Sequence, residues 1–176
     1  EGRITYQSLT STYAALALDV KDGQNVLDVC SAPGGKAIFV AEKNPTANVV
    51  ACDIHPHRVE LIGAYARRMH VKNVTPTLFD GTAFNKEWAR YFDRVLCDVP
   101  CSAMGVVKKQ PDVLLNRNEN DIAALKKVQY SILDNAKNYV KRGGLLVYST
   151  CTIFKEENDD NVEEFLKNNN DFEKYP

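Results

Sequence analysis

Short apolar runs alternate with helical patterns along most of this chain, and that alternation constrains its fold more than any other feature. The apolar runs predict strands at 25–30, 48–54, 74–80, 93–99 and 145–150. The helical patterns predict helices at 36–43, 56–70 and 121–142, and an acidic, exposed helix at 156–169. Strands that alternate with helices form parallel sheets, because each return crossover needs a helix. We therefore predict an α/β fold in a single domain over residues 1–176, with a mostly parallel sheet and helices on both faces.

Composition limits where such a domain can work. The chain has 176 residues, of which 44% are hydrophobic and 26% charged, as in ordinary globular proteins. No apolar run approaches the ~18 residues of a membrane span, and no signal peptide opens the chain. Five scattered cysteines argue against a disulfide framework, so we expect a cytoplasmic protein. We also expect no association with a membrane, and a monomer. The net charge of −1 means that nucleic-acid phosphates would need local basic patches or a partner domain.

The predicted sheet places its ligand site at the carboxyl ends of the strands, near the point where the strand order reverses. Cysteine, proline, glycine and strand-terminal aspartate gather there, at Cys30–Gly35, Asp53, Asp80, Asp98–Cys101 and Thr150–Thr152. By contrast, Cys52 and Cys97 lie inside predicted strands and are expected in the core. The histidines His55, His57 and His70 do not pair with cysteine at metal-ligand spacing, so we expect no metal.

The stretch "CSAPGGK" (30–36) joins a strand to a helix through small residues that let a ligand approach the backbone. It matches neither the P-loop nor GxGxxG, and the plainer interpretation is a tight turn. Asp53 lies 18 residues after Gly35, which suits an acid that accepts ribose hydroxyls, or else a solvated strand-end carboxylate. Asp80 precedes Gly81 and could either cap a turn or accept from an adenine amino group.

Four motifs, "LDVCSAPGGK", "DVPCSAMGVV", "QPD" and "VYSTCTIFKEEN", occur in this order. With them the chain resembles the Sun-type (nucleolar-protein-like) RNA (cytosine-5) methyltransferases, and most of all the bacterial enzymes that modify small-subunit ribosomal RNA. The resemblance runs from about residue 4 to residue 166. It implies a Rossmann-like methyltransferase fold, S-adenosylmethionine as cofactor, and an unstacked cytosine of RNA as substrate.

The resemblance also implies roles for residues of this sequence. The cofactor would be wrapped by Cys30, Ser31, Ala32, Pro33, Gly34, Gly35 and Lys36. Asp53 would hold its ribose, Asp80 its adenine edge, and Asp98 would line both cofactor and base. Cys151 would be the nucleophile and Cys101 would assist its release, an order that rests on the resemblance alone.

The chemistry gives both thiols a task. Carbon 5 of cytosine cannot attack a methyl sulfonium until a thiolate adds to carbon 6, and that thiolate must later be expelled. Cys101 and Cys151 follow the fourth and fifth strands, which are neighbours in the methyltransferase arrangement, so both sulfurs could reach one base. Asp98 could hydrogen-bond the cytosine edge, or be a carboxylate that backbone amides satisfy. The basic residues Lys108, Lys109 and Arg117 could bind phosphates or form a solvated patch.

The chain departs from the family pattern in several places. It has Ser31 and Ala37 in the glycine loop, and Val99, Ala103 and Met104 where "DAPCSGTG" is typical. Family members usually carry an RNA-binding region before this domain and further strands after its last helix. We therefore expect a fragment of a longer protein that lacks both.

Two other functions compete with this one. A nucleotide-binding oxidoreductase would share the topology, but GxGxxG is missing and the strand-end cysteines would have no task. A catalytically inactive methyltransferase-like domain could bind RNA or ribosomes, although the intact Pro-Cys and Thr-Cys motifs argue against it. A comparison of the affinities for adenosylmethionine and NAD distinguishes the oxidoreductase from a methyltransferase. Covalent trapping on RNA distinguishes the inactive domain from an active enzyme.

Overall fold

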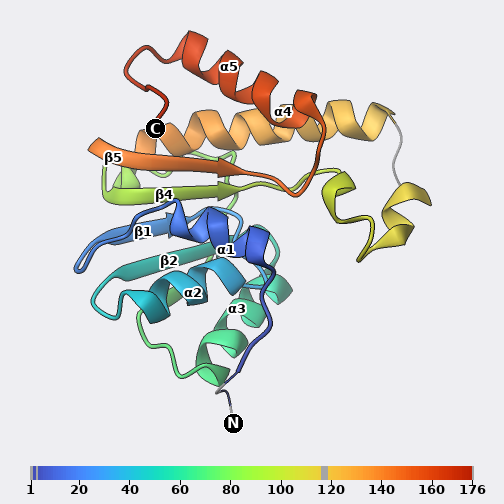
Figure 1. The fold of residues 1–176 in the computed structure, drawn as a ribbon. Coiled ribbons are helices and arrows are strands. Elements are labelled where there is room, and N and C mark those ends of the chain that lie inside the picture. The colour runs from blue at the N-terminus through green and yellow to red at the C-terminus, as the bar shows by residue number, and fades with distance from the viewer. Residues whose placement is uncertain (1, 3, 116–118, 176) are drawn as a thin grey trace.

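The sheet is wholly parallel in the computed structural model, which describes residues 2, 4–115 and 119–175 (Figure 1). Its five strands lie in the order β3-β2-β1-β4-β5, and each neighbouring pair is parallel. The strands are β1 Asn25–Asp28, β2 Asn48–Asp53, β3 Val74–Leu78, β4 Phe92–Asp98 and β5 Val140–Ser149. The helices are α1 Leu9–Leu16, α2 Gly35–Lys43, α3 Pro56–Arg68, α4 Glu119–Ala136 and α5 Asp159–Asn168. The predicted strands and fold class are therefore confirmed.

The strand order creates one reversal point. The chain starts in the middle of the sheet with β1, moves outward to β3, and then crosses over to β4 on the other side of β1. Chain segments that leave β1 and β4 at their carboxyl ends lead to helices on opposite faces, and ligands of open α/β sheets bind at such a reversal point. The glycine loop, residues 30–36, follows β1. The Pro-Cys loop, which carries Pro100 and Cys101, follows β4.

Helices cover both faces of the sheet (Figure 1). Neighbouring strand residues alternate between two cores: Val26 packs with α1, α2 and α3, whereas Leu27 packs with α4. This period of two is expected of a strand buried on both sides. Cys52 and Cys97 are fully buried in the α4-side core, as predicted. No helix of the described ranges is long and apolar enough to cross a membrane.

The helix predicted over 121–142 is shorter than expected. α4 ends at Ala136, a 3-10 turn covers Lys137–Tyr139, and β5 begins at Val140 rather than at Leu145. Tyr139 explains the early end, because its ring is fully buried and its hydroxyl donates to the carbonyl of Ala83. β5 then pairs with β4 through an irregularity that holds Gly143, whose φ is +71°.

Two further helices differ from expectation. The helix predicted as exposed at 156–169 is α5, and it packs against α4 with Asn161 and Phe165 buried. The prediction of an exposed helix is therefore wrong for the face of α5 that carries Asn161 and Phe165, because the acidic residues belong to an amphipathic pattern. α1 was not predicted at all. Its sequence signal is Ser8, whose hydroxyl accepts from the backbone N–H of Ser11 as an N-cap.

Candidate active site

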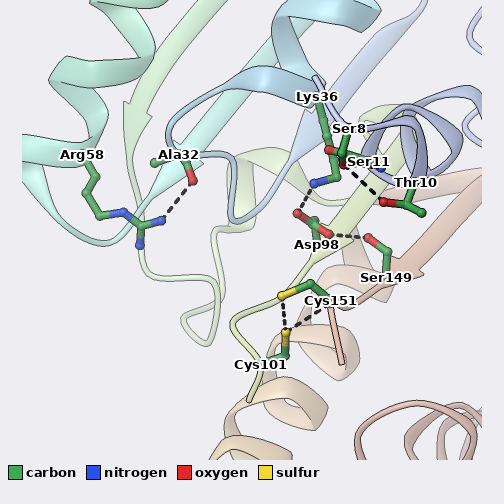
Figure 2. A network of polar contacts seen from close by, with 10 residues as sticks. All are labelled: Ser8, Thr10, Ser11, Ala32, Lys36, Arg58, Asp98, Cys101, Ser149 and Cys151. Carbon is green, nitrogen blue, oxygen red and sulfur yellow. Dashed lines mark hydrogen bonds and ion pairs between the residues drawn. The ribbon is translucent and has the colours of Figure 1, made fainter. Parts of the chain in front are cut away.

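Asp98 links the glycine loop to the end of β5. It is the last residue of β4 and stands in register with Ser149, the last residue of β5. One of its carboxylate oxygens pairs with the Lys36 ammonium at 2.5 Å, and the other accepts from the Ser149 hydroxyl at 2.6 Å (Figure 2). The partners of Asp98 are therefore side chains rather than the backbone amides of the plainer expectation. Through them the carboxylate joins the glycine loop to the end of β5.

The two motif cysteines meet directly below Asp98 in Figure 2. Their Sγ atoms lie 2.9 Å apart, and the backbone N–H of Cys151 also donates to Cys101 Sγ at 3.1 Å. Cys101 is buried, whereas Cys151 is exposed. The prediction that neighbouring strands bring both sulfurs to one place is confirmed.

The contacts make the two thiols unequal. The S–H of Cys151 donates to Cys101 and lowers the pKa of the Cys101 thiol to about 7, against desolvation by burial. The same contact raises the pKa of Cys151, with burial and the Asp98 charge adding to the rise. At neutral pH the pair can therefore hold one negative charge, centred on the buried sulfur.

The glycine loop uses its two glycines differently. Gly34 has a φ of +104°, a left-handed conformation that favours glycine, and it caps α2. Gly35 begins the helix, and a Cβ there would lie 3.8 Å from the Gln7 amide nitrogen. The loop therefore folds tightly against α3 on one side and against the segment before α1 on the other.

Unpartnered polar atoms cluster around this loop. Both carboxylate oxygens of Asp28, the hydroxyl of Ser31 and the amide nitrogen of Gln7 are buried without a hydrogen-bond partner among the described residues. Burial raises the pKa of Asp28 to about 7 and the Asp98 charge adds to the rise, whereas the nearby Ser31 hydroxyl and Cys30 backbone lower it without reaching full hydrogen-bond geometry. Such atoms cost free energy unless something pairs with them, so the loop suits a ligand with charged and hydrogen-bonding groups. The amino-acid end of S-adenosylmethionine has these groups.

Sequence reasoning missed Asp28 and Gln7. Asp28 carried a usable signal, because it is a strand-terminal acid directly before the glycine loop. Gln7 lies in a segment with no periodic pattern, and only the fold brings it to Gly35.

Asp53 has partners that the sequence did not reveal. It is buried at the end of β2, where one oxygen accepts from the His55 backbone N–H at 3.0 Å. Its other oxygen lies 3.2 Å from the Arg58 guanidinium. Figure 2 shows that Arg58 also donates to the carbonyl of Ala32. Arg58 thus ties the loop to β2, and the ribose role of Asp53 stays a prediction.

Asp80 is exposed, and one of its oxygens accepts from the backbone and hydroxyl of Thr82, which is the turn-capping alternative. Its adenine role also stays a prediction. Lys108 and Lys109 are exposed, and Arg117 lies outside the described residues. Within the described part of the chain, no group of three or more histidine, cysteine, aspartate or glutamate side chains could hold a metal ion.

A family model described as "16S rRNA methyltransferase RsmB/F" matches residues 15–176. The chain belongs to the RsmB/F family. The family resemblance that the motifs indicated is thereby confirmed.

Relatives of this RsmB/F chain support the assignment. It is 40% identical over 178 residues to a Bacillus subtilis protein named "Probable ribosomal RNA small subunit methyltransferase B", covering 98% of the chain and 39% of that protein. The crystal structure of PH0851 has a TM-score of 0.91 and 34% identity, over 94% of this chain and 38% of that one. The structure of NSun6 from Pyrococcus horikoshii with SFG has a TM-score of 0.82 and 30% identity, over 92% and 41%. The chain thus spans about two fifths of the length of these relatives.

Proposed function

We propose that this chain is the catalytic domain of an S-adenosylmethionine-dependent methyltransferase that methylates carbon 5 of a cytosine in ribosomal RNA. The observation that carries the proposal is the thiol pair, 2.9 Å apart at the ends of two neighbouring strands. A Lys36–Asp98 ion pair joins the end of β4, three residues before Cys101, to the glycine loop. Hydride transfer by a nucleotide-binding oxidoreductase would need neither thiol, and the family assignment supports methyl transfer to RNA.

The exposed Cys151 is the nucleophile in this proposal. Its sulfur adds to carbon 6 of the cytosine while its proton passes to the Cys101 thiolate, 2.9 Å away. The ring electrons move toward N3, and carbon 5 becomes nucleophilic. Cys101 is buried behind Cys151, which suits a proton acceptor that never touches the ring.

Asp98 and Lys36 would orient the two reactants. The Asp98 carboxylate is half-buried and keeps lone pairs free beside its bonds to Lys36 and Ser149, so it can accept from the cytosine amino edge. Lys36 stands at the start of α2, where its ammonium offsets the negative charge of Asp98 and the thiolate.

Asp28, Ser31 and Gln7 would hold the amino-acid end of the cofactor, because they are buried and unpartnered. Bound S-adenosylmethionine supplies an electrophilic methyl group. After the transfer, carbon 5 loses its proton to solvent and the bond between carbon 6 and Cys151 breaks. Cys101, now a thiol, returns the proton to the departing Cys151 sulfur.

Trapping on fluorinated RNA tests the proposal. Fluorine cannot leave carbon 5 as a proton does, so a small-subunit ribosomal RNA transcript that contains 5-fluorocytidine should hold the enzyme covalently. With S-adenosylmethionine present, we expect an adduct on a denaturing gel for the parent and for Cys101→Ala, and none for Cys151→Ala.

Two results would contradict the proposal. An adduct in Cys151→Ala that is lost in Cys101→Ala would reverse the order of the cysteines. RNA binding without an adduct in the parent would favour the inactive RNA- or ribosome-binding domain. Binding titrations with S-adenosylmethionine and NAD provide the control for the cofactor, and preference for NAD would support an oxidoreductase.

A further inference from the structure

A fully buried carboxylate lies behind the thiol pair. Glu157 ends the 3-10 turn Lys155–Glu157, six residues after Cys151, and none of its side chain is exposed. Among the described residues no lysine, arginine or histidine forms an ion pair with it. A buried carboxylate without a cation is costly unless several donors satisfy it. Its donors show what it does.

We propose that Glu157 is a positioning residue that fixes the distance between the Cys101 and Cys151 sulfurs by fastening together the two loops that carry them. Its importance for catalysis rests on the proposed function, whereas its effect on the thiols can be measured without RNA or cofactor.

Glu157 holds the Pro-Cys loop on both sides of Cys101. Its carboxylate accepts the backbone N–H of Ser102 at 2.9 Å and the Ser102 hydroxyl at 2.5 Å. It also accepts from the Gln129 amide at 2.8 Å, and the same amide nitrogen donates to the carbonyl of Pro100 at 2.9 Å. The residues before and after Cys101 are thus tied to one carboxylate, directly or through α4.

Glu157 also forms hydrogen bonds beside the Thr-Cys loop, the segment after β5 that carries Thr150 and Cys151. Its backbone carbonyl accepts from the Tyr148 hydroxyl, which belongs to β5, at 2.7 Å. The hydroxyls of Ser102 and Thr152 lie 2.8 Å apart, within hydrogen-bond distance, so the residues that follow the two cysteines are also in contact. Removal of the carboxylate would leave the buried Ser102 N–H without its acceptor, take one of two acceptors from the Gln129 amide, and free the Pro-Cys loop to move away from Cys151.

The structure also indicates which substitution of Glu157 should keep the two loops together. In Glu157→Gln, one oxygen can still accept from Ser102 N–H and from Gln129. The new amide nitrogen can donate to the Ser102 hydroxyl, which then donates to Thr152. The loops should hold, and only the charge is lost. In Glu157→Ala the three hydrogen bonds to the carboxylate are lost, whereas the Tyr148 bond to the backbone carbonyl stays.

The two variants should affect the titration of the thiol pair differently. Asp98 from β4, Glu157 from the 3-10 turn and Tyr148 from β5 are the titratable groups that face it. The Glu157 charge raises the pKa of Cys101, and the Asp98 charge raises that of Cys151, while the contact between the thiols lowers the pKa of Cys101. Glu157→Gln should therefore keep or lower the pKa of the pair. Glu157→Ala should let it return toward about 8.5, the value of a free thiol.

The test is the pH dependence of iodoacetamide alkylation, with Cys101 and Cys151 followed by mass spectrometry of their peptides. The parent should react with an apparent pKa near 7, and Glu157→Ala should react about eightfold more slowly at pH 7.5, the ratio of thiolate fractions for pKa values of 7 and 8.5. Glu157→Gln should match the parent or react faster. Parent-like titration of a folded Glu157→Ala would overturn the proposal, as would a Glu157→Gln that behaves like the alanine variant.

Circular dichroism shows whether Glu157→Ala folds. If it does not, Ser102→Ala decides, because it removes the hydroxyl donor and the Thr152 contact but keeps the backbone bond. It should shift the titration in the same direction by a smaller amount, and an unchanged titration would overturn the proposal. Trapping on fluorinated RNA keeps the two claims separate. If the parent is not trapped but Glu157→Ala still shifts the titration, only the proposed function fails. If the parent is trapped and Glu157→Ala titrates normally, only the positioning role fails.

Discussion

The backbone N–H of Gly105 donates to the carbonyl of Cys151 at 2.9 Å, so the loop after Cys101 lies directly on the backbone of the Thr-Cys loop. A Cβ at Gly105 would stand 2.8 Å from that oxygen, closer than side chains tolerate. Glycine is required here for close approach rather than for its φ. The contact is a second link between the two loops, besides those made by Glu157.

We expect Gly105→Ala to separate the two loops. It should lower the free energy of unfolding by about 1–3 kcal/mol, as overpacking does, and raise the apparent pKa for alkylation of the cysteines. Urea unfolding and the alkylation titration measure the two effects. Gly23→Ala is the control: Gly23 has a positive φ of 75°, unlike Gly105, so alanine strains its backbone, but no atom lies within 4 Å of its missing Cβ. It should lose stability without any change in the thiols; parent-like thiols in Gly105→Ala would contradict the prediction.

Ala103 is strained where the family pattern has glycine. Its φ is +62°, in the left-handed region, at the start of a 3-10 turn. We expect Ala103→Gly to raise the free energy of unfolding by up to about 1 kcal/mol, because relief of the left-handed strain outweighs the extra entropy of glycine in the unfolded chain. The midpoint of urea unfolding measures it. Ala136→Gly, a buried helical position, should instead lower stability, and a less stable Ala103→Gly would contradict the argument.

Asp28 should make the stability of the protein depend on pH. Its folded pKa of about 7 lies above the ordinary 3.8, so between these values the native state binds a proton that the unfolded state releases. The stabilisation is complete below pH 4 and is lost as the pH rises to about 7, by at most about 4 kcal/mol. Unfolding at pH 5 and pH 8 should show more than half of this fall in the parent and a smaller fall in Asp28→Asn. Equal falls in both would assign the effect to other groups.

The low pKa of the thiol pair should need both cysteines. In Cys151→Ala, Cys101 loses the S–H donor that is the largest cause of its lowered pKa. In Cys101→Ala, Cys151 loses the neighbour that is the largest cause of its raised pKa, but burial and the Asp98 charge still hold its pKa above that of a free thiol. Neither variant should keep an apparent pKa near 7 in the alkylation assay. If one does, its remaining cysteine is acidic for reasons other than the pair.

The parallel sheet and the meeting of the two cysteines could be predicted from sequence, because both follow from local patterns. Each strand is a short apolar run with a turn behind it, and strand ends in a parallel sheet meet at one edge. Gly34, Asp53 and Asp98 could also be predicted, because they lie at or just after the ends of strands.

The partners of these residues could not be predicted, because they come from distant parts of the chain. Arg58 reaches Asp53 and Ala32 from a helix whose sequence shows only an amphipathic pattern. Glu157 reads as one acid in an acidic surface run, and only the fold buries it against Ser102 and Gln129. The end of α4 was missed for a similar reason, since the burial of Tyr139 outweighs the helical pattern that continues past it.

The sequence distance between the two cysteines bears on how the protein acquires its chemistry. Cys101 and Cys151 are 50 positions apart, and their contact exists only when β5 has joined the outer edge of the sheet beside β4. Closure of so long a loop is entropically costly and belongs to the slower part of folding. A chain in which β1 to β4 have assembled without β5 would carry two ordinary thiols. Acidity of this pair is therefore a property of the finished molecule alone, and its appearance during refolding would time the arrival of the last strand.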